Sequence, residues 1–455
     1  MPSTKHPHNG SGARHASRKP ADGRARGRGG NSKRRPGNHA AQKNSTPYPQ
    51  SDGPCPLMRA CGGCEWLGLP YRKQLARKQT AMQELFQPVL DSSRSDVREL
   101  EPIFGMGGRA GDGKIASPRA FRYKAATPFA PGEHGEVRCG FFARGTHRII
   151  EVPNCIVEAP GAREILNGVA RIAQELGIPA YDEDSHQGIL RYAVLRLGWK
   201  TDQGVLTLVT SRRDVAHLDE LALRAMRLDP RITCVAQNIN PRVTNAILGG
   251  ETRVIAGSPS MRDKLLGCTF EISPTAFYQT NPQQTELLYK LAIDGMALTE
   301  GDVLMDAYCG SGTIGLCAAA DARERGASIS LLGVERNAAG IIDAKANAEL
   351  NGLANSCEFI AKDATEFMLE AAREGRRIDV LSIDPPRAGS TPEFLDAAIS
   401  LAPRRITYIS CNPQTQCRDL QHLMQGDYHL ERLSLVDMFP HTTHVETVAV
   451  LRREQ

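Results

Sequence analysis

The second half of the chain alternates short apolar runs with stretches of helical periodicity. The runs lie at residues 303–305, 331–334, 359–361, 380–383 and 406–409. Short runs that are apolar throughout are typical of strands buried on both faces, so the alternation predicts a doubly wound, mostly parallel sheet of the α/β class. A helix over 282–296, with Asn281 as N-cap and Pro282 at its first position, leads into the first strand. Two last runs, 433–436 and 445–451, predict a closing hairpin.

The first half is patterned differently. Over residues 71–89 apolar positions recur at helical spacing, which predicts a helix with one packed face. That face holds Tyr71, Leu75, Met82, Leu85, Phe86 and Val89, and the other sides hold Arg72, Lys73, Arg77 and Lys78. From 190 to 270, short alternating runs predict an antiparallel sheet. We therefore expect a tail at 1–52, a smaller central α+β domain at 53–270 and a C-terminal α/β domain at 271–455.

The net charge of +5 hides a strong asymmetry. Residues 1–50 carry eleven Lys and Arg against one acid, Asp22, which gives +10 and leaves −5 for the rest of the chain. This segment is rich in Gly, Arg, Ser and Pro and cannot bury enough surface to offset its ordering entropy, so we expect a disordered tail. It would attract phosphates without sequence preference, or serve only as a solubilising extension.

Whether the cysteines are reduced, ligate a metal or form disulfides depends on the cellular compartment of the protein. No apolar run approaches the ~18 residues that a membrane span needs, and the start lacks the apolar core of a signal peptide, so we expect a cytoplasmic protein with no membrane partner. Its cysteines would then be reduced or ligate a metal. Cys55, Cys61 and Cys64 are spaced C-x5-C-x2-C, which suits a soft metal. A fourth ligand is required, for which Cys139 is a candidate on spacing alone, and these residues by themselves suit zinc and an iron–sulfur cluster equally.

The first predicted strand ends in Asp306 and is followed by a glycine-rich turn. Gly310, Gly312 and Gly315 spell G-x-G-x-x-G, in which glycine lets the backbone approach a ligand and adopt positive φ. Glu335 ends the next apolar run, 23 residues past Gly312, where an acid can bind ribose hydroxyls. The pattern predicts a nucleotide-type cofactor, without separating a nicotinamide dinucleotide from S-adenosylmethionine.

The two following strands separate these cofactors. The runs at 380–383 and 406–409 end in Asp-Pro-Pro-Arg (384–387) and Ser-Cys-Asn-Pro (410–413). Both tetrapeptides lie where the carboxyl ends of parallel strands open into a ligand crevice. A dehydrogenase needs neither of them, whereas a methyltransferase that acts on a pyrimidine base can use both.

With Phe-Tyr-Gln-Thr-Asn at 277–281 and the segment 437–446, these motifs resemble those of the RNA uracil-5-methyltransferase family, whose members make 5-methyluridine in ribosomal or transfer RNA. The resemblance covers roughly residues 55–452, in order. It implies a class I (Rossmann-like) methyltransferase domain, S-adenosyl-L-methionine as methyl donor and a [4Fe-4S] cluster. The implied cofactor-binding residues are Gln279, Tyr308, Thr313, Glu335, Asp363 and Asp384, and the implied cluster ligands are Cys55, Cys61, Cys64 and Cys155. Alternatively, Asp363 only caps the following helix.

The family's chemistry requires a nucleophile and a late base. C5 of uracil is a poor nucleophile, so a thiolate first adds to C6, and after methyl transfer a base removes the C5 proton. The resemblance assigns the thiolate to Cys411 and the base to Glu446. Outside it, Cys411 would be a small buried hydrophobe and Glu446 a surface charge. Ser410, in place of a proline, argues against a cytosine-5 enzyme, and Arg387, in place of an aromatic, argues against an adenine-N6 enzyme.

The implied partner is 23S ribosomal RNA, bound by a monomer. Transfer RNA is the alternative, and a non-catalytic RNA-binding or assembly factor with a vestigial cofactor site is the alternative of another class. Many family members begin with a small oligonucleotide-binding barrel, for which this chain has no sequence. Residues 121–124 and 141–144 alternate aromatic and basic side chains, which would stack bases and follow phosphates, or form ordinary strands. The basic side of the helix at 71–89 is a further expected RNA contact.

Overall fold

The computed structural model describes residues 54–110, 117–143 and 145–454. The basic tail predicted at 1–52 lies outside these residues, as does Arg144. The described residues belong to one compact unit. Within this part of the chain, no helix combines the length and the apolar character that crossing a membrane requires.

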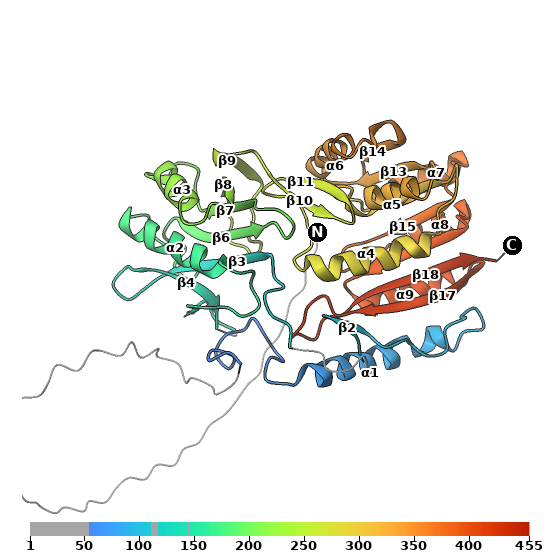
Figure 1. The fold of residues 1–455 in the computed structure, drawn as a ribbon, viewed down its shortest axis with the longest axis horizontal. Coiled ribbons are helices and arrows are strands. Elements are labelled where there is room, and N and C mark those ends of the chain that lie inside the picture. The colour runs from blue at the N-terminus through green and yellow to red at the C-terminus, as the bar shows by residue number, and fades with distance from the viewer. Residues whose placement is uncertain (1–53, 111–116, 144, 455) are drawn as a thin grey trace, which may run out of the picture. The chain divides into compact units, whose positions relative to one another are not determined.

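The C-terminal half is built on a mixed sheet of nine strands among the described residues (Figure 1). From edge to edge these are β14 (Cys357–Ala361), β13 (Ser330–Glu335), β12 (Val303–Ala307), β15 (Val380–Ile383), β16 (Arg405–Ser410), β18 (Glu446–Arg453), β17 (Tyr428–Val436), β1 (Phe104–Gly105) and β2 (Gly108–Arg109). The five strands β12 to β16 are parallel. The chain winds outward from β12 through β13 and β14 and then returns to β15 on the other side of β12, which confirms the predicted doubly wound sheet.

The predicted closing hairpin is also confirmed. Strand β18 lies between β16 and β17 and is antiparallel to both. Beyond β17 the sheet is extended by β1, which pairs in parallel with Phe104 opposite Val436, and then by the short antiparallel strand β2. Residues from the first quarter of the chain thus complete the sheet of the C-terminal half.

Helices cover both faces of this sheet. One face packs against α4 (Pro282–Met296), α5 (Thr313–Glu324) and α6 (Ala338–Leu350), and the other against α1 (Tyr71–Leu90), α7 (Ala364–Glu374), α8 (Pro392–Leu401) and α9 (Pro413–Leu423). A single 3-10 turn among the described residues, η1 (Ala354–Ser356), precedes β14. Asn281 caps α4, its side chain accepting from the Gln284 amide at 3.3 Å, as the Asn-Pro pair predicts. In the same way, Pro follows the caps of α8 and α9.

Helix α1 has the predicted apolar face, and Arg72, Lys73 and Arg77 are exposed as expected, whereas Lys78 is not. Tyr71, Leu75, Phe86 and Val89 are buried against the sheet and α9. Lys78, which we expected on a side facing RNA, is only 1% exposed. That expectation is wrong because Lys78 pairs with a carboxylate inside the protein, which helical periodicity alone does not reveal.

The central part of the chain forms a seven-stranded sheet among the described residues. Its order is β5 (Ile149–Glu151), β4 (Val137–Phe142), β3 (Lys124–Pro131), β6 (Leu190–Leu197), β7 (Gly204–Thr210), β8 (Ile232–Ile239) and β9 (Glu251–Gly257). Helices α2 (Ala162–Glu175) and α3 (Leu218–Met226) pack on it through apolar side chains. All neighbouring pairs are antiparallel except β7 and β8, which are parallel because α3 carries the chain back across the sheet between them. The antiparallel prediction is therefore wrong for this pair.

A separate hairpin follows the central sheet. Its strands are β10 (Met261–Leu265) and β11 (Cys268–Ile272), and their buried side chains join the core formed with α4, α5 and α6. The domain boundary expected at 270 stays a prediction. Two features bear on it. This hairpin spans residue 270, and α1 and β1 precede it, yet all of them pack in the C-terminal half.

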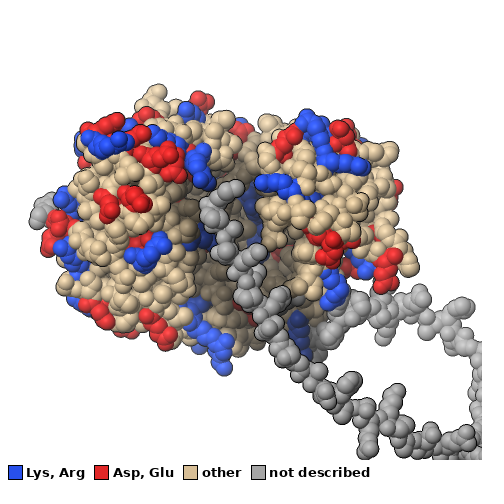
Figure 2. All heavy atoms as spheres, turned by 180° about the vertical axis from the view of Figure 1, so that it is seen from behind, with Lys and Arg blue, Asp and Glu red and all other residues tan. Residues whose placement is uncertain are grey.

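Charged side chains are unevenly spread over the surface. On the face shown in Figure 2, Lys and Arg are interspersed with Asp and Glu over the outer surface. The charged side chains visible in the hollow of that face are mostly Lys and Arg. Basic groups in a concave surface are suited to a polyanionic ligand, because the surrounding protein focuses their field.

Candidate active site

The glycine-rich turn connects β12 to α5. Gly312 caps the helix at φ +79°, and Gly310 has φ +55°, both in the left-handed region that glycine adopts readily. Tyr308 shares this conformation at φ +63°, which is uncommon for a residue with a side chain. A Cβ atom on Gly310 would have no atom within 4 Å of it, so the turn leaves open space beside its backbone. The turn therefore has the predicted form of a cofactor loop.

Asp306 holds this turn in place, a role that the sequence analysis did not assign. Its Oδ2 accepts from the Gly315 amide at 2.9 Å. A Cβ atom on Gly315 would lie 2.9 Å from that oxygen and 2.7 Å from Leu331 Cδ1, so only glycine fits there. Burial raises the pKa of Asp306 to about 7. The acid at the end of the strand before the glycines was the signal that could have identified it.

One predicted cofactor residue, Glu335, lines a cavity beside the turn. Gly310 and Glu335 line this cavity, of about 110 Å³, with Phe277, Asn337 and Asp343. Glu335 Oε1 accepts from the Asn337 amide at 2.7 Å, which fixes the carboxylate at the end of β13. The donor-rich, open turn beside a fixed acid fits the ribose end of a nucleoside cofactor.

Four further residues of the predicted set lie at helix starts or in the segments between elements. Thr313 Oγ1 is 3.2 Å from the hydroxyl of Tyr289 on α4. The Tyr308 ring packs on Phe394, with 5.6 Å between ring centroids. Asp363 caps α7, its Oδ1 accepting from the Thr365 amide at 2.9 Å, and its role at the cofactor stays a prediction. Gln279 is half-buried in the segment before α4.

Sheet register brings the two predicted catalytic residues together. Strands β16 and β18 are antiparallel, and Ser410 pairs with Thr447. Cys411 directly follows Ser410 and Glu446 directly precedes Thr447, so the next opposed positions are the thiol and the carboxylate. They are 35 residues apart in the sequence.

The electrostatics of this group confirm that its members are close. Burial raises the pKa of Glu446 to about 8, with Asp384 adding to the shift and Arg387 opposing it. Burial likewise raises the pKa of Cys411, helped by the carboxylates of Glu446 and Asp384 and opposed by Arg387. The pKa of Asp384 itself is raised to about 7, first by burial and then by Asp306. The site thus holds one thiol, two carboxyl groups that titrate near neutrality and one guanidinium.

Exposure separates Cys411 from two other cysteines of this domain, Cys309 and Cys417. Cys411 is half-buried at the open end of its strand. Cys309 is buried beneath the glycine turn, and Cys417 is buried on α9 with its thiol 3.4 Å from the Leu85 carbonyl oxygen. Of these three thiols, Cys411 is the one that a substrate reaches most directly.

The four predicted cluster ligands line one cavity. Cys55, Cys61, Cys64 and Cys155 surround it together with apolar side chains that include Leu57, Leu67, Phe141 and Val152. Burial raises the pKa of Cys64 to about 12, and Cys155 is the next contributor. Among the described residues, no three His, Cys, Asp or Glu side chains are arranged to hold a single metal ion. The donor set nevertheless fits a thiophilic group, because four cysteine sulfurs line one cavity and soft metals prefer sulfur ligands.

The rival fourth ligand is placed elsewhere. Cys139 is buried in the core between β4 and α2, where its thiol lies 3.2 Å from Asn167 Oδ1. It does not line the cysteine cavity. Phe121 also departs from expectation: it is 3% exposed and packs on His441, with 6.2 Å between ring centroids, so the prediction that it stacks on bases is wrong.

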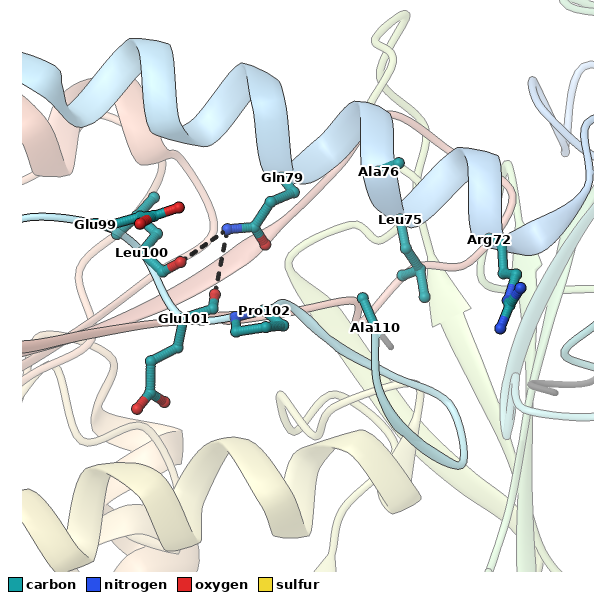
Figure 3. Close-up of a pocket in the computed structure, with 9 residues that line it drawn as sticks. All are labelled: Arg72, Leu75, Ala76, Gln79, Glu99, Leu100, Glu101, Pro102 and Ala110. Carbon is teal, nitrogen blue, oxygen red and sulfur yellow. Dashed lines mark hydrogen bonds between the residues drawn. The ribbon is translucent and has the colours of Figure 1, made fainter. Parts of the chain in front are cut away.

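A larger groove lies away from all of these residues. It has a volume of about 680 Å³ and runs between α1 and the segment 99–110 (Figure 3). Gln79 bridges its two sides by donating to the carbonyl oxygens of Leu100 and Glu101, each at 3.2 Å. None of the predicted catalytic, cofactor or cluster residues lines it.

Comparison with known proteins identifies the family. An RNA methyltransferase of Halalkalibacterium halodurans is 37% identical over 400 residues, which cover 88% of this chain and 83% of that protein. One of Staphylococcus aureus is 36% identical over 397 residues, covering 87% and 83%. Residues 254–454 match the family model described as tRNA (Uracil-5-)-methyltransferase. The chain belongs to the RNA uracil-5-methyltransferase family.

The solved structures agree with this assignment. The tRNA (uracil-54, C5)-methyltransferase of Pyrococcus abyssi, in complex with S-adenosyl-L-homocysteine, superposes with a TM-score of 0.67 at 26% identity. The match covers 87% of this chain and 86% of that one. The fold predicted from the sequence is therefore confirmed, and the protein is an S-adenosylmethionine-dependent RNA methyltransferase.

Proposed function

We propose that this methyltransferase modifies C5 of a specific uridine through a covalent bond between Cys411 and C6 of the base. The observation that carries the proposal is the register of β16 and β18, which sets the Cys411 thiol opposite the Glu446 carboxylate. A reaction that first needs a thiolate and later a base at adjacent atoms of one ring requires such a pair.

The steps follow from these two groups. The Cys411 thiolate forms a bond to C6, and the electron pair of the C5–C6 double bond moves toward C5 and the O4 carbonyl. C5 then forms its bond to the methyl carbon of the bound S-adenosylmethionine while the methyl–sulfur bond breaks, and the sulfur keeps that electron pair as S-adenosylhomocysteine. Glu446 removes the proton from C5, the C5–C6 double bond re-forms, and the bond from C6 to Cys411 breaks to regenerate the thiolate.

Electrostatics supports the assignment of the base. A general base works best when its pKa lies near the working pH, and burial places the pKa of Glu446 at about 8. Arg387 opposes the raised pKa of both Glu446 and Cys411, so it favours their ionised forms. The remaining proposed roles are those of the cofactor set: Glu335 at the ribose, Asp363 at the adenine side, and Gln279, Tyr308, Thr313 and Asp384 lining the rest of the site.

RNA with 5-fluorouracil at the target position tests the mechanism. Thiolate addition and methyl transfer can proceed on that base, but fluorine cannot leave as a proton, so Glu446 has nothing to remove. We expect a protein–RNA adduct on a denaturing gel only when S-adenosylmethionine is supplied. Cys411→Ala should abolish it, whereas Cys417→Ala, six residues away, should leave it unchanged. Methylation by Cys411→Ala at a rate comparable to the wild type would overturn the mechanism.

We propose 23S ribosomal RNA as the substrate. The C-x5-C-x2-C spacing of Cys55, Cys61 and Cys64 supports this proposal, because it resembles that of the ribosomal branch of the family. Transfer RNA is the second candidate, favoured by the description of the matching family model and by the name of the Pyrococcus abyssi enzyme. Comparing 5-methyluridine in ribosomal and transfer RNA between a deletion strain and its parent decides between them. Loss from transfer RNA alone would overturn our choice.

We also propose that the cysteine cavity holds a [4Fe-4S] cluster. Support comes from the convergence of Cys55, Cys61, Cys64 and Cys155 on one largely apolar cavity. A cluster spreads its four thiolates farther apart than a single zinc ion does, and the described residues offer no compact group of three metal ligands. We also propose that the protein is cytoplasmic and acts as a monomer.

A further inference from the structure

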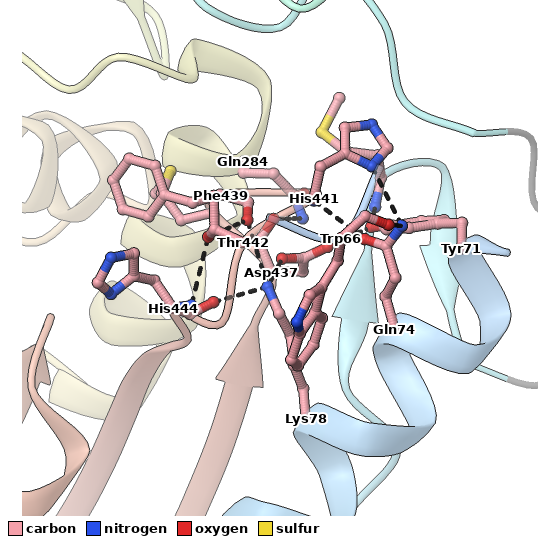
Figure 4. A network of polar contacts seen from close by, with 12 residues as sticks. Trp66, Tyr71, Gln74, Lys78, Gln284, Asp437, Phe439, His441, Thr442 and His444 are labelled. Atoms are coloured by element: carbon pink, nitrogen blue, oxygen red, sulfur yellow. Dashed lines mark hydrogen bonds and ion pairs between the residues drawn. The ribbon is translucent and has the colours of Figure 1, made fainter. Parts of the chain in front are cut away.

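The segment 437–445, which connects β17 to Glu446, is held from inside by α1 (Figure 4). Lys78 Nζ donates to Asp437 Oδ1 at 2.5 Å, to the Phe439 carbonyl oxygen at 3.2 Å and to the His444 carbonyl oxygen at 2.7 Å. An ammonium group has three donors, and all three are used. The contacts reach from the first residue of the segment to a position two residues before Glu446.

Two other side chains of α1 add to this contact. The Tyr71 hydroxyl donates to Asp437 Oδ2 at 2.6 Å. Gln74 Oε1 accepts from the His441 amide at 3.0 Å, and Gln74 Nε2 lies 3.2 Å from His441 Nδ1. His441 Nε2 lies 3.0 Å from the Pro118 carbonyl oxygen and so carries the proton, which leaves Nδ1 as the acceptor for Gln74. His441 is fully buried at φ +66°, so the segment is fixed in an unusual backbone conformation.

The cofactor side of the molecule holds the same segment from the opposite direction. Asn281 Nδ2 donates to the Met438 carbonyl oxygen at 2.9 Å, and Gln284 Nε2 donates to the Asp437 carbonyl oxygen at 3.2 Å. Asn281 is the cap of α4 and lies two residues after Gln279. The segment before Glu446 is therefore fixed between α1 and the start of α4.

Burying a charged pair is a costly way to stabilise a fold. Lys78 and Asp437 have side chains that are 1% and 0% exposed, and removing two charges from water offsets most or all of their attraction. Apolar residues of similar volume would stabilise this place as well. Apolar residues would not supply the three hydrogen bonds that Lys78 Nζ donates to Asp437, Phe439 and His444. These bonds determine the path of the chain that leads to Glu446.

We propose that Lys78 is a positioning residue for the removal of the C5 proton. By holding residues 437–445 it keeps the Glu446 carboxylate opposite Cys411, and it acts on no earlier step. The inference rests on the proposed function, because it assumes that Glu446 is the base. Thiolate addition and methyl transfer use Cys411 and groups on other loops, to which Lys78 donates no hydrogen bond, so we expect these steps to change little.

The test is Lys78→Met, which keeps the length of the side chain and removes the ammonium. With ordinary uracil RNA in single turnover, we expect methyl transfer at close to the wild-type rate and release of product slowed about 10- to 100-fold, as for other displaced catalytic groups. A methylated protein–RNA adduct should accumulate on denaturing gels. Arg191→Met is the matched control, since Arg191 is also 1% exposed and ion-paired, with Glu183 in the central part of the chain, and it should accumulate none.

A second variant separates positioning from stability. Lys78→Met leaves Asp437 buried without its partner, which by itself destabilises the fold. In Lys78→Met with Asp437→Asn the uncompensated charge is gone, so the resistance to urea should recover. Slow product release should persist, because the contacts to Phe439 and His444 are still missing. Recovery of release together with stability would overturn the inference, and so would equal slowing of methyl transfer and release.

Trapping on 5-fluorouracil RNA is run alongside. If the wild type forms no adduct there, the proposed function fails, and the result says nothing specific about Lys78. If the wild type and Lys78→Met both trap on 5-fluorouracil but Lys78→Met releases ordinary product at the wild-type rate, the proposed function stands and the inference alone is overturned.

Discussion

Glu446 and Cys411 are poised by being buried beside each other. Burial is the main reason that the pKa values of both groups are raised; the Asp384 carboxylate adds to both shifts, and Arg387 opposes both. In the proposed cycle Cys411 and Glu446 do not have to be anions at the same time. The Cys411 sulfur is already bonded to C6 of the uracil when Glu446 removes the proton from C5. At that stage Asp384 is the neighbouring carboxylate whose charge still raises the pKa of Glu446.

The pH dependence of stability reports on Glu446. Its pKa is about 8 in the folded protein and 4.5 for the ordinary side chain, so the folded state binds the proton more tightly. Its contribution to the free energy of unfolding is full below about pH 4.5 and is lost as pH rises through about 8. Glu446→Gln cannot ionise, so its stability relative to the wild type should increase over this window by an amount of the order of a few kcal/mol.

Urea denaturation of both proteins at several pH values between 5 and about 9 measures this difference. The wild type supplies the reference at each pH, so ionisations elsewhere in the chain cancel. A stability difference that stays constant across the window would show that Glu446 is exposed to solvent or already ionised.

At the level of helices and strands, the sequence predicts some features of the fold and misses others. Apolar runs identified β12, β13, β15 and β16 because strands buried on both faces leave an unbroken pattern. The parallel pairing of β7 and β8 was missed, since alternation shows which face is buried and not which way the neighbouring strand runs. Motifs assign roles to Cys411 and Glu446, but they do not show that the two lie opposite each other, because the β16–β18 register depends on contacts distant in sequence.

Single residues were missed for a related reason. Lys78 was assigned to a solvated side of its helix because only the tertiary fold supplies the Asp437 carboxylate that permits its burial. Asp306 was noted as the end of a strand, but its bond to the Gly315 amide depends on how tightly the turn closes. Phe121 matched an RNA-facing pattern and instead fills space beside His441.

The turn before α5 provides a test of the cofactor loop. Gly312→Ala places a side chain at φ +79°, which costs about 1–2 kcal/mol, and its Cβ would lie 3.2 Å from Leu316 Cδ1 and 3.3 Å from Ala344 Cβ. We expect lower stability and weaker binding of S-adenosylhomocysteine by calorimetry. Gly326→Ala is the control: its φ is +83°, but no atom lies within 4 Å of the added Cβ, so it should lose stability alone. Equal loss of binding in both variants would refute a specific role for the turn.

Segments far apart along the chain lie together at the cysteine cavity and at the segment that leads to Glu446. Cys55, Cys61 and Cys64 precede α1, Cys155 follows β5, and all four line one cavity. Trp66, two residues after Cys64, donates its amide to the His441 carbonyl oxygen at 2.9 Å. Gln74 donates to the Trp66 carbonyl oxygen at 3.0 Å as well as contacting His441. The loop that carries three of the cysteines is thus hydrogen-bonded to the segment that leads to Glu446.

Because of this connection, the group bound in the cysteine cavity matters for the segment that leads to Glu446 as well. Protein purified without oxygen should be brown and contain about four iron atoms per chain, since four thiolates in one apolar cavity suit a [4Fe-4S] cluster. Cys61→Ser should lose the colour and most of the iron, and Cys139→Ser should keep both, because Cys139 lies in a separate core. Iron and zinc are measured by elemental analysis, and the cluster by its visible absorption. Stoichiometric zinc without iron would refute the cluster, and equal iron loss in the two variants would refute the choice of ligands.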